Sequence, residues 1–218
     1  MANYVIGDIQ GCFDEYSLLL NKIKFDSKKD FIWLTGDLIN RGPASLSVLK
    51  HVYDNRKAIK TVLGNHDLHF LAVYYGVRKP NKFDTLSDLF NSQHVDDLAK
   101  WLIKQPLVRE IKIGKREFIM VHAGFPKSAT KKLLTEVNRK IKKALKNNPK
   151  KLFVVEKDKD LVLGLSVFNS FFKECTSFCN SEYISFSTSY SSLVTKPLSA
   201  KYRSKRPFTA FSISPVAF

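Results

Sequence analysis

Four short apolar runs in the first 125 residues each end in a polar side chain, and three of them do so through a glycine. The polar residues are Asp8, Asp37, Asn65 and His122. Helical patterns separate the runs, which predicts an α/β sheet with covering helices. Because the carboxyl ends of the strands in an open α/β sheet share one edge, we expect these four side chains to converge in one crevice.

The spacing of the polar residues supports this arrangement. Asp37 follows Asp8 by 29 residues, and Asn65 follows Asp37 by 28, so each is one strand–helix unit from the next. We predict strands at 4–6, 31–34, 61–63, 108–113 and 118–121, and helices at 13–23, 43–53, 67–76, 84–92, 95–104 and 131–146.

The side chains at the strand ends form a mixed set of oxygen and nitrogen donors. Two carboxylates, an amide oxygen and an imidazole suit Mn²⁺, Fe or Zn²⁺ better than Ca²⁺, which prefers oxygen alone. Each residue taken singly has an ordinary structural role as a turn residue, a helix cap or a buried histidine. The combination at matching positions favours a metal site.

The motifs around these residues resemble those of the calcineurin-like metallophosphoesterases. They read GDIQG at 7–11, GDLINRG at 36–42, GNHD at 64–67 and VHAG at 121–124. Within that superfamily, the stretches GDIQGCFDE, LTGDLINRGPASL and VLGNHDLHFLAV are similar to the bacterial symmetrical bis(5'-nucleosyl)-tetraphosphatases, the diadenosine tetraphosphate hydrolases. The resemblance covers about residues 3–125.

The resemblance implies a fold, a reaction and a set of roles. The fold is a β-sandwich flanked by helices in four layers, αββα, and the reaction is symmetrical cleavage of diadenosine tetraphosphate to two ADP. A divalent metal pair, Mn²⁺ first with Co²⁺, Fe or Zn²⁺ as alternatives, would activate the attacking water. The implied metal ligands are Asp8, Gln10, Asp37, Asn65 and His122, with Asp37 bridging. The implied catalytic residues are His66, which protonates the leaving oxygen, Arg41, which holds a phosphate, and Asp37.

Two positions depart from the wider superfamily. Gln10 stands where most members place a metal-binding histidine, and it offers only a neutral carbonyl oxygen. Asn40 stands where the phosphoprotein phosphatases place an aspartate that orients the general-acid histidine. We expect the amide oxygen of Asn40 to accept a hydrogen bond from His66 without stabilising the charged imidazolium.

The second half of the chain lacks a ligand that the family supplies late in its sequence. None of the five histidines lies beyond His122. Three explanations are open: an out-of-frame tail after a frameshift, a divergent lid, or a substitute ligand such as Glu174 or Asp160. The frameshift hypothesis predicts that another reading frame of the gene restores a Gly-His motif past about residue 150.

Composition divides the chain into two parts. Residues 166–218 hold 13 Ser and 8 Phe, and no helical or strand period persists there. We therefore expect a metallophosphoesterase core at 1–165, whose C-terminal part is incomplete or aberrant. Residues 166–218 would be a divergent tail that is frameshifted or poorly ordered.

Charge and cysteine usage bound the partners and the location. The net charge is +16, and 127–151 holds ten basic residues against one acidic residue. No aromatic side chains interleave this run, so a solvated helix face is favoured over a nucleic-acid site. No apolar run reaches membrane-span length, no secretory signal is visible, and three cysteines make no disulfide framework. A cytoplasmic protein with a dinucleoside polyphosphate substrate, and no membrane or nucleic-acid partner, is expected.

The alternatives to an active tetraphosphatase are a phosphoesterase of different specificity on the same scaffold and a catalytically impaired member of the family. Substrate competition separates the first alternative from the main hypothesis. Metal content per chain separates the second, because a chain without the late histidine ligand is expected to hold metal poorly.

Overall fold

The computed structural model describes residues 1–122, 130–153 and 210–213. Six strands lie at β1 Asn3–Ile6, β2 Phe31–Leu34, β3 Ile59–Thr61, β4 Val108–Ile113, β5 Arg116–Val121 and β6 Ala210–Ile213. Seven helices lie at α1 Phe13–Lys22, α2 Ser45–Asp54, α3 Asn65–Tyr74, α4 Ser87–Phe90, α5 Val95–Leu102, α6 Lys131–Asn147 and α7 Pro149–Phe153.

The larger sheet has the strand order β3-β2-β1-β6. Strands β1, β2 and β3 run parallel, with Ile6 opposite Leu34 and Leu34 opposite Thr61. Their carboxyl ends therefore meet at one edge, as predicted. Strand β6 pairs antiparallel with β1, with Ala210 opposite Ile6.

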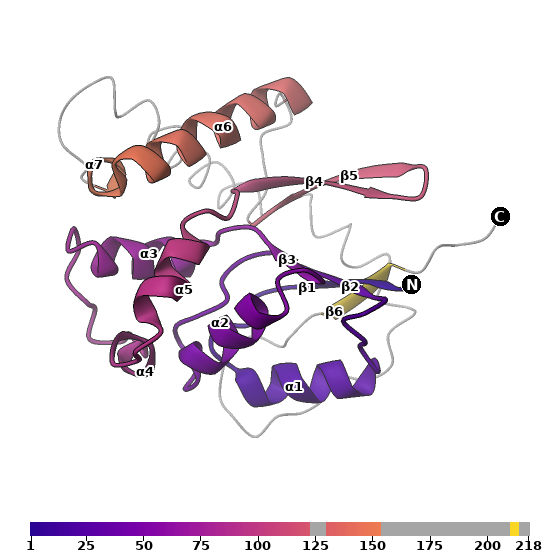
Figure 1. The fold of residues 1–218 in the computed structure, drawn as a ribbon, viewed down its shortest axis with the longest axis horizontal. Coiled ribbons are helices and arrows are strands. Elements are labelled where there is room, and N and C mark those ends of the chain that lie inside the picture. The colour runs from indigo at the N-terminus through magenta and orange to yellow at the C-terminus, as the bar shows by residue number, and fades with distance from the viewer. Residues whose placement is uncertain (123–129, 154–209, 214–218) are drawn as a thin grey trace, which may run out of the picture.

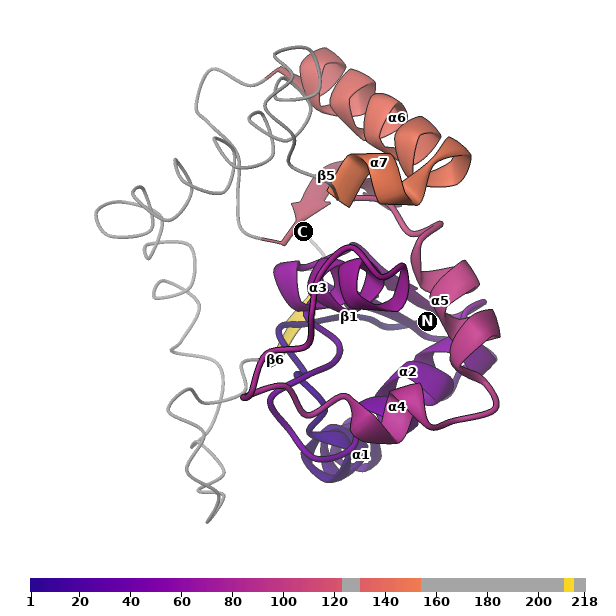
Figure 2. The same cartoon turned by 90° about the vertical axis from the view of Figure 1, so that its left-hand side faces the viewer.

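The second sheet is the β4–β5 hairpin, and it faces the first sheet. Figures 1 and 2 show α1 and α2 on the outer side of the larger sheet, the hairpin on the other side, and α6 beyond the hairpin. The two sheets are joined by a small apolar cluster in which Val62 packs with Ile111 and Met120, with Trp33 beside them. The order helix, sheet, sheet, helix confirms the expected four-layer fold.

The main core lies between the larger sheet and its helices. Ile6, Ile32 and Leu34 are fully buried on the sheet, and Leu49 of α2 and Phe70 of α3 are equally buried. Full burial of each such side chain contributes about 1.5–3 kcal/mol. This packing holds the strand ends in place, and the loops that follow them carry the polar residues.

Several boundaries differ from prediction by one to three residues, and in three elements hydrogen bonds explain the difference. The third strand ends at Thr61 rather than spanning 61–63, because the Leu63 amide leaves the sheet and donates to the Pro106 carbonyl. Helix α3 begins at Asn65 rather than at 67, since Asp67 supports its first turn by accepting from the Gly64 amide. Helix α4 is also shorter than the predicted 84–92, because the Asp84 carboxylate accepts from the Asn81 amide in the turn that precedes the helix.

Much of the C-terminal third lies outside the described residues. This applies to Glu174 and Asp160, the expected substitute ligands, and to the boundary at residue 165. The domain division and the frameshift origin of 166–218 stay predictions. Strand β6 falls within that segment and pairs with β1. Among the helices that the structure describes, none has the length and apolarity needed to cross a bilayer.

Candidate metal centre

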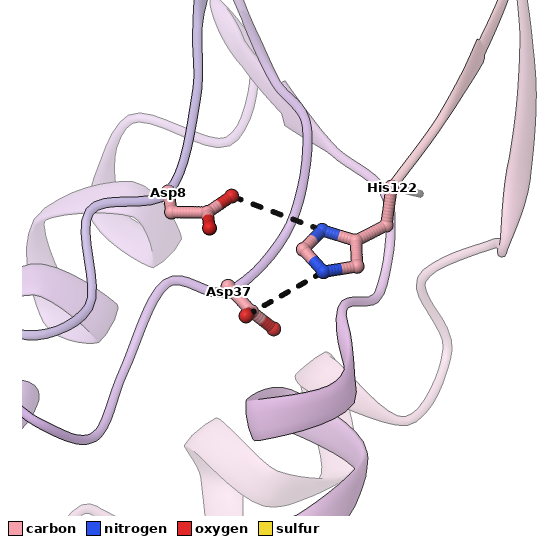
Figure 3. Close-up of side chains that lie close together, drawn as sticks. All are labelled: Asp8, Asp37 and His122. Carbon is pink, nitrogen blue, oxygen red and sulfur yellow. Dashed lines mark ion pairs between the residues drawn. The ribbon is translucent and has the colours of Figure 1, made fainter. Parts of the chain in front are cut away.

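The strand-end residues converge as the sequence predicts. Asp8 follows β1, Asp37 follows β2, and His122 follows β5. One potential ligand atom from each of these three side chains lies within 4.8 Å of the other two. Figure 3 shows both carboxylates directed toward the His122 ring. The cluster therefore joins strand ends of the larger sheet, which carry Asp8 and Asp37, to the end of β5, which carries His122.

Asp37 is the buried member of the cluster, with 2% of its surface exposed. Its backbone is left-handed at φ 51°, and so are those of Asn40 at 74° and Arg41 at 69°. Such conformations cost about 1–2 kcal/mol per non-glycine residue and concentrate at functional sites. The loop is held nonetheless, because the Asp37 carbonyl accepts from the Gln10 amide at 2.9 Å.

Two glycines let the loops approach Asp37 closely. Gly36 has φ +98°, and a Cβ there would lie 2.6 Å from the Gly64 nitrogen. A Cβ at Gly64 would collide with both the carboxylate and the backbone nitrogen of Asp37. The Gly-Asp and Gly-Asn pairs are therefore a packing requirement of the site.

The Asp67 carboxylate holds together the two loops that follow β2 and β3. Its carboxylate accepts backbone N–H groups from Asp37 at 3.0 Å, Leu38 at 3.0 Å and Gly64 at 2.9 Å. Complete burial, then the nearby Asp37 carboxylate, raises the pKa of Asp67 to about 7, against the lowering effect of the Gly64 and Leu38 amides. Two buried carboxylates side by side repel each other, and a cation nearby would relieve this repulsion.

Both ring nitrogens of His122 face oxygen atoms of neighbouring residues. Nδ1 lies 2.9 Å from the Thr35 carbonyl, to which it donates its proton. Nε2 lies 3.1 Å from Asn65 Oδ1 and 3.5 Å from Asp37 Oδ2, both oxygens that accept hydrogen bonds. Asp8 Oδ1 lies 4.0 Å from Nδ1. Carboxylate, amide and imidazole donors are thus gathered around one point, and this mixture of donors suits a divalent cation.

His66 lies beside this cluster. Its amide donates to Asp37 Oδ1 at 2.8 Å, and its ring Nε2 lies 3.9 Å from Asp37 Oδ2. Burial lowers the pKa of His66, and the Asp37 carboxylate opposes this while Arg41 adds to it. The His66 side chain is 13% exposed, and its ring faces the Asp37 carboxylate, which His122 also faces.

The predicted hydrogen bond between His66 and the Asn40 oxygen is wrong. Asn40 Oδ1 instead accepts backbone N–H groups from Arg41 at 2.8 Å and Thr85 at 3.0 Å. The amide nitrogen of Asn40 faces His66 Nδ1 at 3.4 Å. No local sequence pattern indicates this orientation, because Thr85 lies 45 residues further along the chain.

The structure places the remaining predicted residues in the same loops. Gln10 has a left-handed backbone at φ 48°, and its backbone N–H donates to the Asp37 carbonyl. Arg41 and Asn65 are exposed, Arg41 in the loop after β2 and Asn65 at the start of α3. All seven predicted residues therefore lie in the loops that follow β1, β2 and β5 or in the first turn of α3.

Sequence reasoning missed the supporting residues of the site. Asp84 bonds both Asn40 and His69, and Asp67 and Thr35 hold the loops and the His122 ring. His69 is not among the residues that the sequence places at the site. The only local signal was the turn-forming sequence around Asn81 and Asp84, which does not reveal its distant partners.

The donor set fits a divalent ion pair. Asp37 is a buried carboxylate whose two oxygens face different neighbours, Oδ1 the His66 amide and Oδ2 the His122 ring. Asn65 adds an amide oxygen 3.1 Å from His122 Nε2, and Asp8 adds a second carboxylate. The mixture of carboxylate, amide and imidazole matches Mn²⁺, Fe and Zn²⁺ chemistry.

Comparison with known proteins identifies relatives with similar sequences. One similar protein, the symmetrical bis(5'-nucleosyl)-tetraphosphatase of Hamiltonella defensa subsp. Acyrthosiphon pisum (strain 5AT), is 46% identical over 157 residues, 71% of this chain and 55% of that protein. A protein of the same name from Cellvibrio japonicus (strain Ueda107) is 50% identical over 127 residues, 58% of this chain and 46% of that protein. The chain spans about half the length of the curated relatives it matches.

The fold also resembles a solved structure, and most of the sequence matches the model of one protein family. The crystal structure of a mutant cold-active protein tyrosine phosphatase superposes with TM-score 0.50 at 22% identity, covering 73% of this chain and 53% of that one. The family model of the calcineurin-like phosphoesterases matches residues 3–186. The chain therefore belongs to the calcineurin-like phosphoesterase family.

Proposed function

We propose that the chain hydrolyses dinucleoside polyphosphates, cleaving diadenosine tetraphosphate symmetrically to two ADP with a divalent metal pair, Mn²⁺ first. The observation that carries the proposal is the convergence of Asp8, Asp37 and His122 at the strand ends. The names of the two relatives support the choice of substrate.

The metal pair would be held on both sides of Asp37. Asp8 and Gln10 would hold the first ion, Asn65 and His122 would hold the second, and Asp37 would serve both. When bound, the ions activate water and neutralise phosphate charge. Burial of Asp37 in a backbone network keeps the bridge in place before the ions bind, which lowers the reorganisation needed for catalysis.

Two residues act on the substrate directly. Arg41 is exposed at the edge of the site, and its planar, permanently charged guanidinium binds phosphate oxygens as a fork. His66 provides a proton or hydrogen-bond donor for the leaving phosphate oxygen from its position beside Asp37. Removing such a donor lowers rates by about 10²–10⁴-fold.

The test is hydrolysis of diadenosine tetraphosphate by the purified full chain with Mn²⁺, with the products resolved by chromatography. Asp37→Asn keeps the side-chain shape and removes the bridging charge. The matched control is Asp54→Asn, because Asp54 is an exposed carboxylate that pairs with Lys50 away from the site. We expect ADP as the sole product, lost in Asp37→Asn and kept in Asp54→Asn.

Two outcomes overturn the proposal. Products of ATP and AMP would show cleavage at a different bond and therefore another specificity. Absence of turnover by a chain that unfolds cooperatively would show that this chain is impaired, as a missing late histidine would predict.

We further propose a cytoplasmic location and retain the expected core at 1–165. The odd number of cysteines supports the location. Fractionation of bacterial cells tests the location: recovery in the cytoplasmic fraction is expected, and recovery in the periplasmic fraction would contradict it.

A further inference from the structure

The segment between α3 and α4 carries an aromatic side chain that is open to solvent. Phe83 is 62% exposed, and among the large apolar side chains that are strongly exposed in the described part of the chain it is the aromatic one. A single exposed apolar residue is common on protein surfaces, so exposure alone assigns no role to Phe83. Its role depends on how its segment is held and on which groups surround the ring.

The turn that carries Phe83 is held by its own hydrogen bonds. The Phe83 amide donates to Asn81 Oδ1 at 3.2 Å, and the Asp84 amide donates to the Asn81 carbonyl at 2.9 Å. The Asn81 amide donates in return to Asp84 Oδ2 at 2.7 Å. The backbone on both sides of Phe83 is therefore fixed, and a ligand that contacts the ring pays little to order it.

The same turn is fastened to the loop that follows β2. Asp84 Oδ1 accepts from the side-chain amide of Asn40 at 2.9 Å. Thr85 donates its backbone N–H to Asn40 Oδ1 at 3.0 Å and its hydroxyl to the Gly42 carbonyl at 2.8 Å. These contacts lie on either side of Arg41, and Figure 1 shows the segment beside α3, at the end of the larger sheet where β1, β2 and β3 finish. The turn therefore borders the candidate metal centre.

The surface around Phe83 is basic. Residues 78–83 include Arg78, Lys79 and Lys82, all exposed, and no acidic residue. The Lys82 ammonium lies over the Phe83 ring, 4.8 Å from the ring centroid. It is attracted to the negative face of the ring and places positive charge beside it. An aromatic ring next to several cations suits a ligand that has both a flat ring and phosphate groups.

We propose that Phe83 is a stacking platform for one nucleobase of the substrate, and that the basic residues beside it bind the phosphates next to that base. The inference rests on the proposed hydrolase function, because it supplies a subsite for a nucleoside that extends away from the metal centre. A base stacks through its face, so Phe83 detects that a base is present and not which base it is. Phe83 is thus a specificity-determining residue that favours nucleotides over polyphosphates without a base.

The kinetic test compares the wild type with Phe83→Ala, using diadenosine tetraphosphate and excess Mn²⁺. Loss of a stacking contact made equally in the ground and transition states is expected to raise KM about tenfold and to leave kcat within about twofold. Inorganic tetraphosphate, which has no base, is the matched competitive inhibitor, and its inhibition constant is expected to stay within about twofold. An unchanged KM, or an equal loss of affinity for inorganic tetraphosphate, overturns the proposal.

Two further variants separate stacking from a general loss of structure. Phe83→Trp keeps an aromatic face and is expected to keep KM within about threefold of the wild type. Leu18→Ala removes an apolar side chain of α1 that is also 62% exposed, and it is expected to leave KM unchanged. A Phe83→Trp chain as impaired as Phe83→Ala, or a Leu18→Ala chain with the same defect, contradicts the stacking role.

Binding of ADP gives a readout that does not depend on hydrolysis. In the full Phe83→Trp chain, ADP is expected to quench the indole fluorescence beyond the change seen in the wild type, which contains only Trp33 and Trp101. Inorganic pyrophosphate, which lacks the base, is expected to cause no such quenching. Equal quenching by the two ligands, or none by ADP, overturns the proposal. If ADP quenches the indole but the wild type hydrolyses no diadenosine tetraphosphate, the proposed function fails and the nucleobase site stands.

Discussion

Two groups of buried polar side chains in this molecule differ in their hydrogen bonding. At the strand ends, Asp37, Asn40 and Asp67 are almost completely buried, and each is tied to backbone groups of neighbouring loops. Between α1 and α2, the Tyr16 hydroxyl and His51 Nε2 are also buried, yet neither has a hydrogen-bond partner among the residues that the structure describes.

The difference separates polar groups that position a site from polar groups that only fill space. The rings of Tyr16 and His51 pack edge to face with centroids 5.5 Å apart, so their apolar surface is what the helices use. The strand-end groups instead determine where charges lie. Apolar or smaller replacements should therefore be costly at the strand ends, whereas removing an unpaired polar atom between the helices should be nearly neutral.

The largest effect is expected for Gly64→Ala. The new Cβ would collide with the carboxylate and the backbone nitrogen of Asp37. We expect about 3 kcal/mol lower free energy of unfolding in urea, together with loss of Mn²⁺ binding. Gly114→Ala is the control: it has φ +59° but no atom near the new Cβ, so it should cost about 1 kcal/mol. Equal costs for the two variants would show that the close approach does not matter.

Asp67→Asn should come next. One carboxylate oxygen that accepts a backbone N–H becomes an NH₂ group, so a buried donor loses its partner. The expected loss is about 2 kcal/mol in the free energy of unfolding, measured by urea denaturation. A variant as stable as the wild type would mean that the clamp contributes little to holding the loops.

Tyr16→Phe should be neutral or stabilising by up to about 1 kcal/mol, because it removes a buried hydroxyl that has no partner among the described residues. The substitution keeps the ring that packs on His51. Thermal unfolding followed by circular dichroism provides the measurement. A fall in Tm of several degrees would reveal a hydrogen bond and remove the contrast between the two regions.

The smallest effect is a change in pH dependence on replacing His51. Burial lowers the pKa of His51, with Asp54 opposing the shift. Below pH of about 6.5 the unfolded chain therefore binds this proton more tightly than the folded chain, so stability falls as the pH drops. His51→Phe should flatten the stability profile below about pH 6.5, and an unaltered profile would contradict the assignment.

Sequence alone was sufficient for the fold class and for the convergence of the site. Gly-Asp pairs after apolar runs reveal strand ends because a parallel sheet brings all such ends to one edge. Asp8, Asp37 and His122 were predicted to meet, and they do. The spacing of one strand–helix unit carried that prediction, since it depends on topology and not on side-chain detail.

The support of the site could not be predicted in the same way. Asp84 contacts Asn40 across 44 residues, and the direction of the Asn40 amide depends on the Thr85 amide. No local pattern specifies such contacts, because they depend on how two loops pack. The pairing of β6 with β1 was missed for a related reason: a four-residue strand far along the chain has no periodicity to detect.

The most direct test of the account is the metal content of the purified chain. After loading with Mn²⁺ and removal of free ions, wild type should retain about two ions per chain, as a bridged pair requires. Asp37→Asn should retain markedly less, while Asp54→Asn should match the wild type. A folded wild-type chain that retains no Mn²⁺, Co²⁺, Fe or Zn²⁺, or an Asp37→Asn chain that retains as much as wild type, would contradict a metal centre at the strand ends.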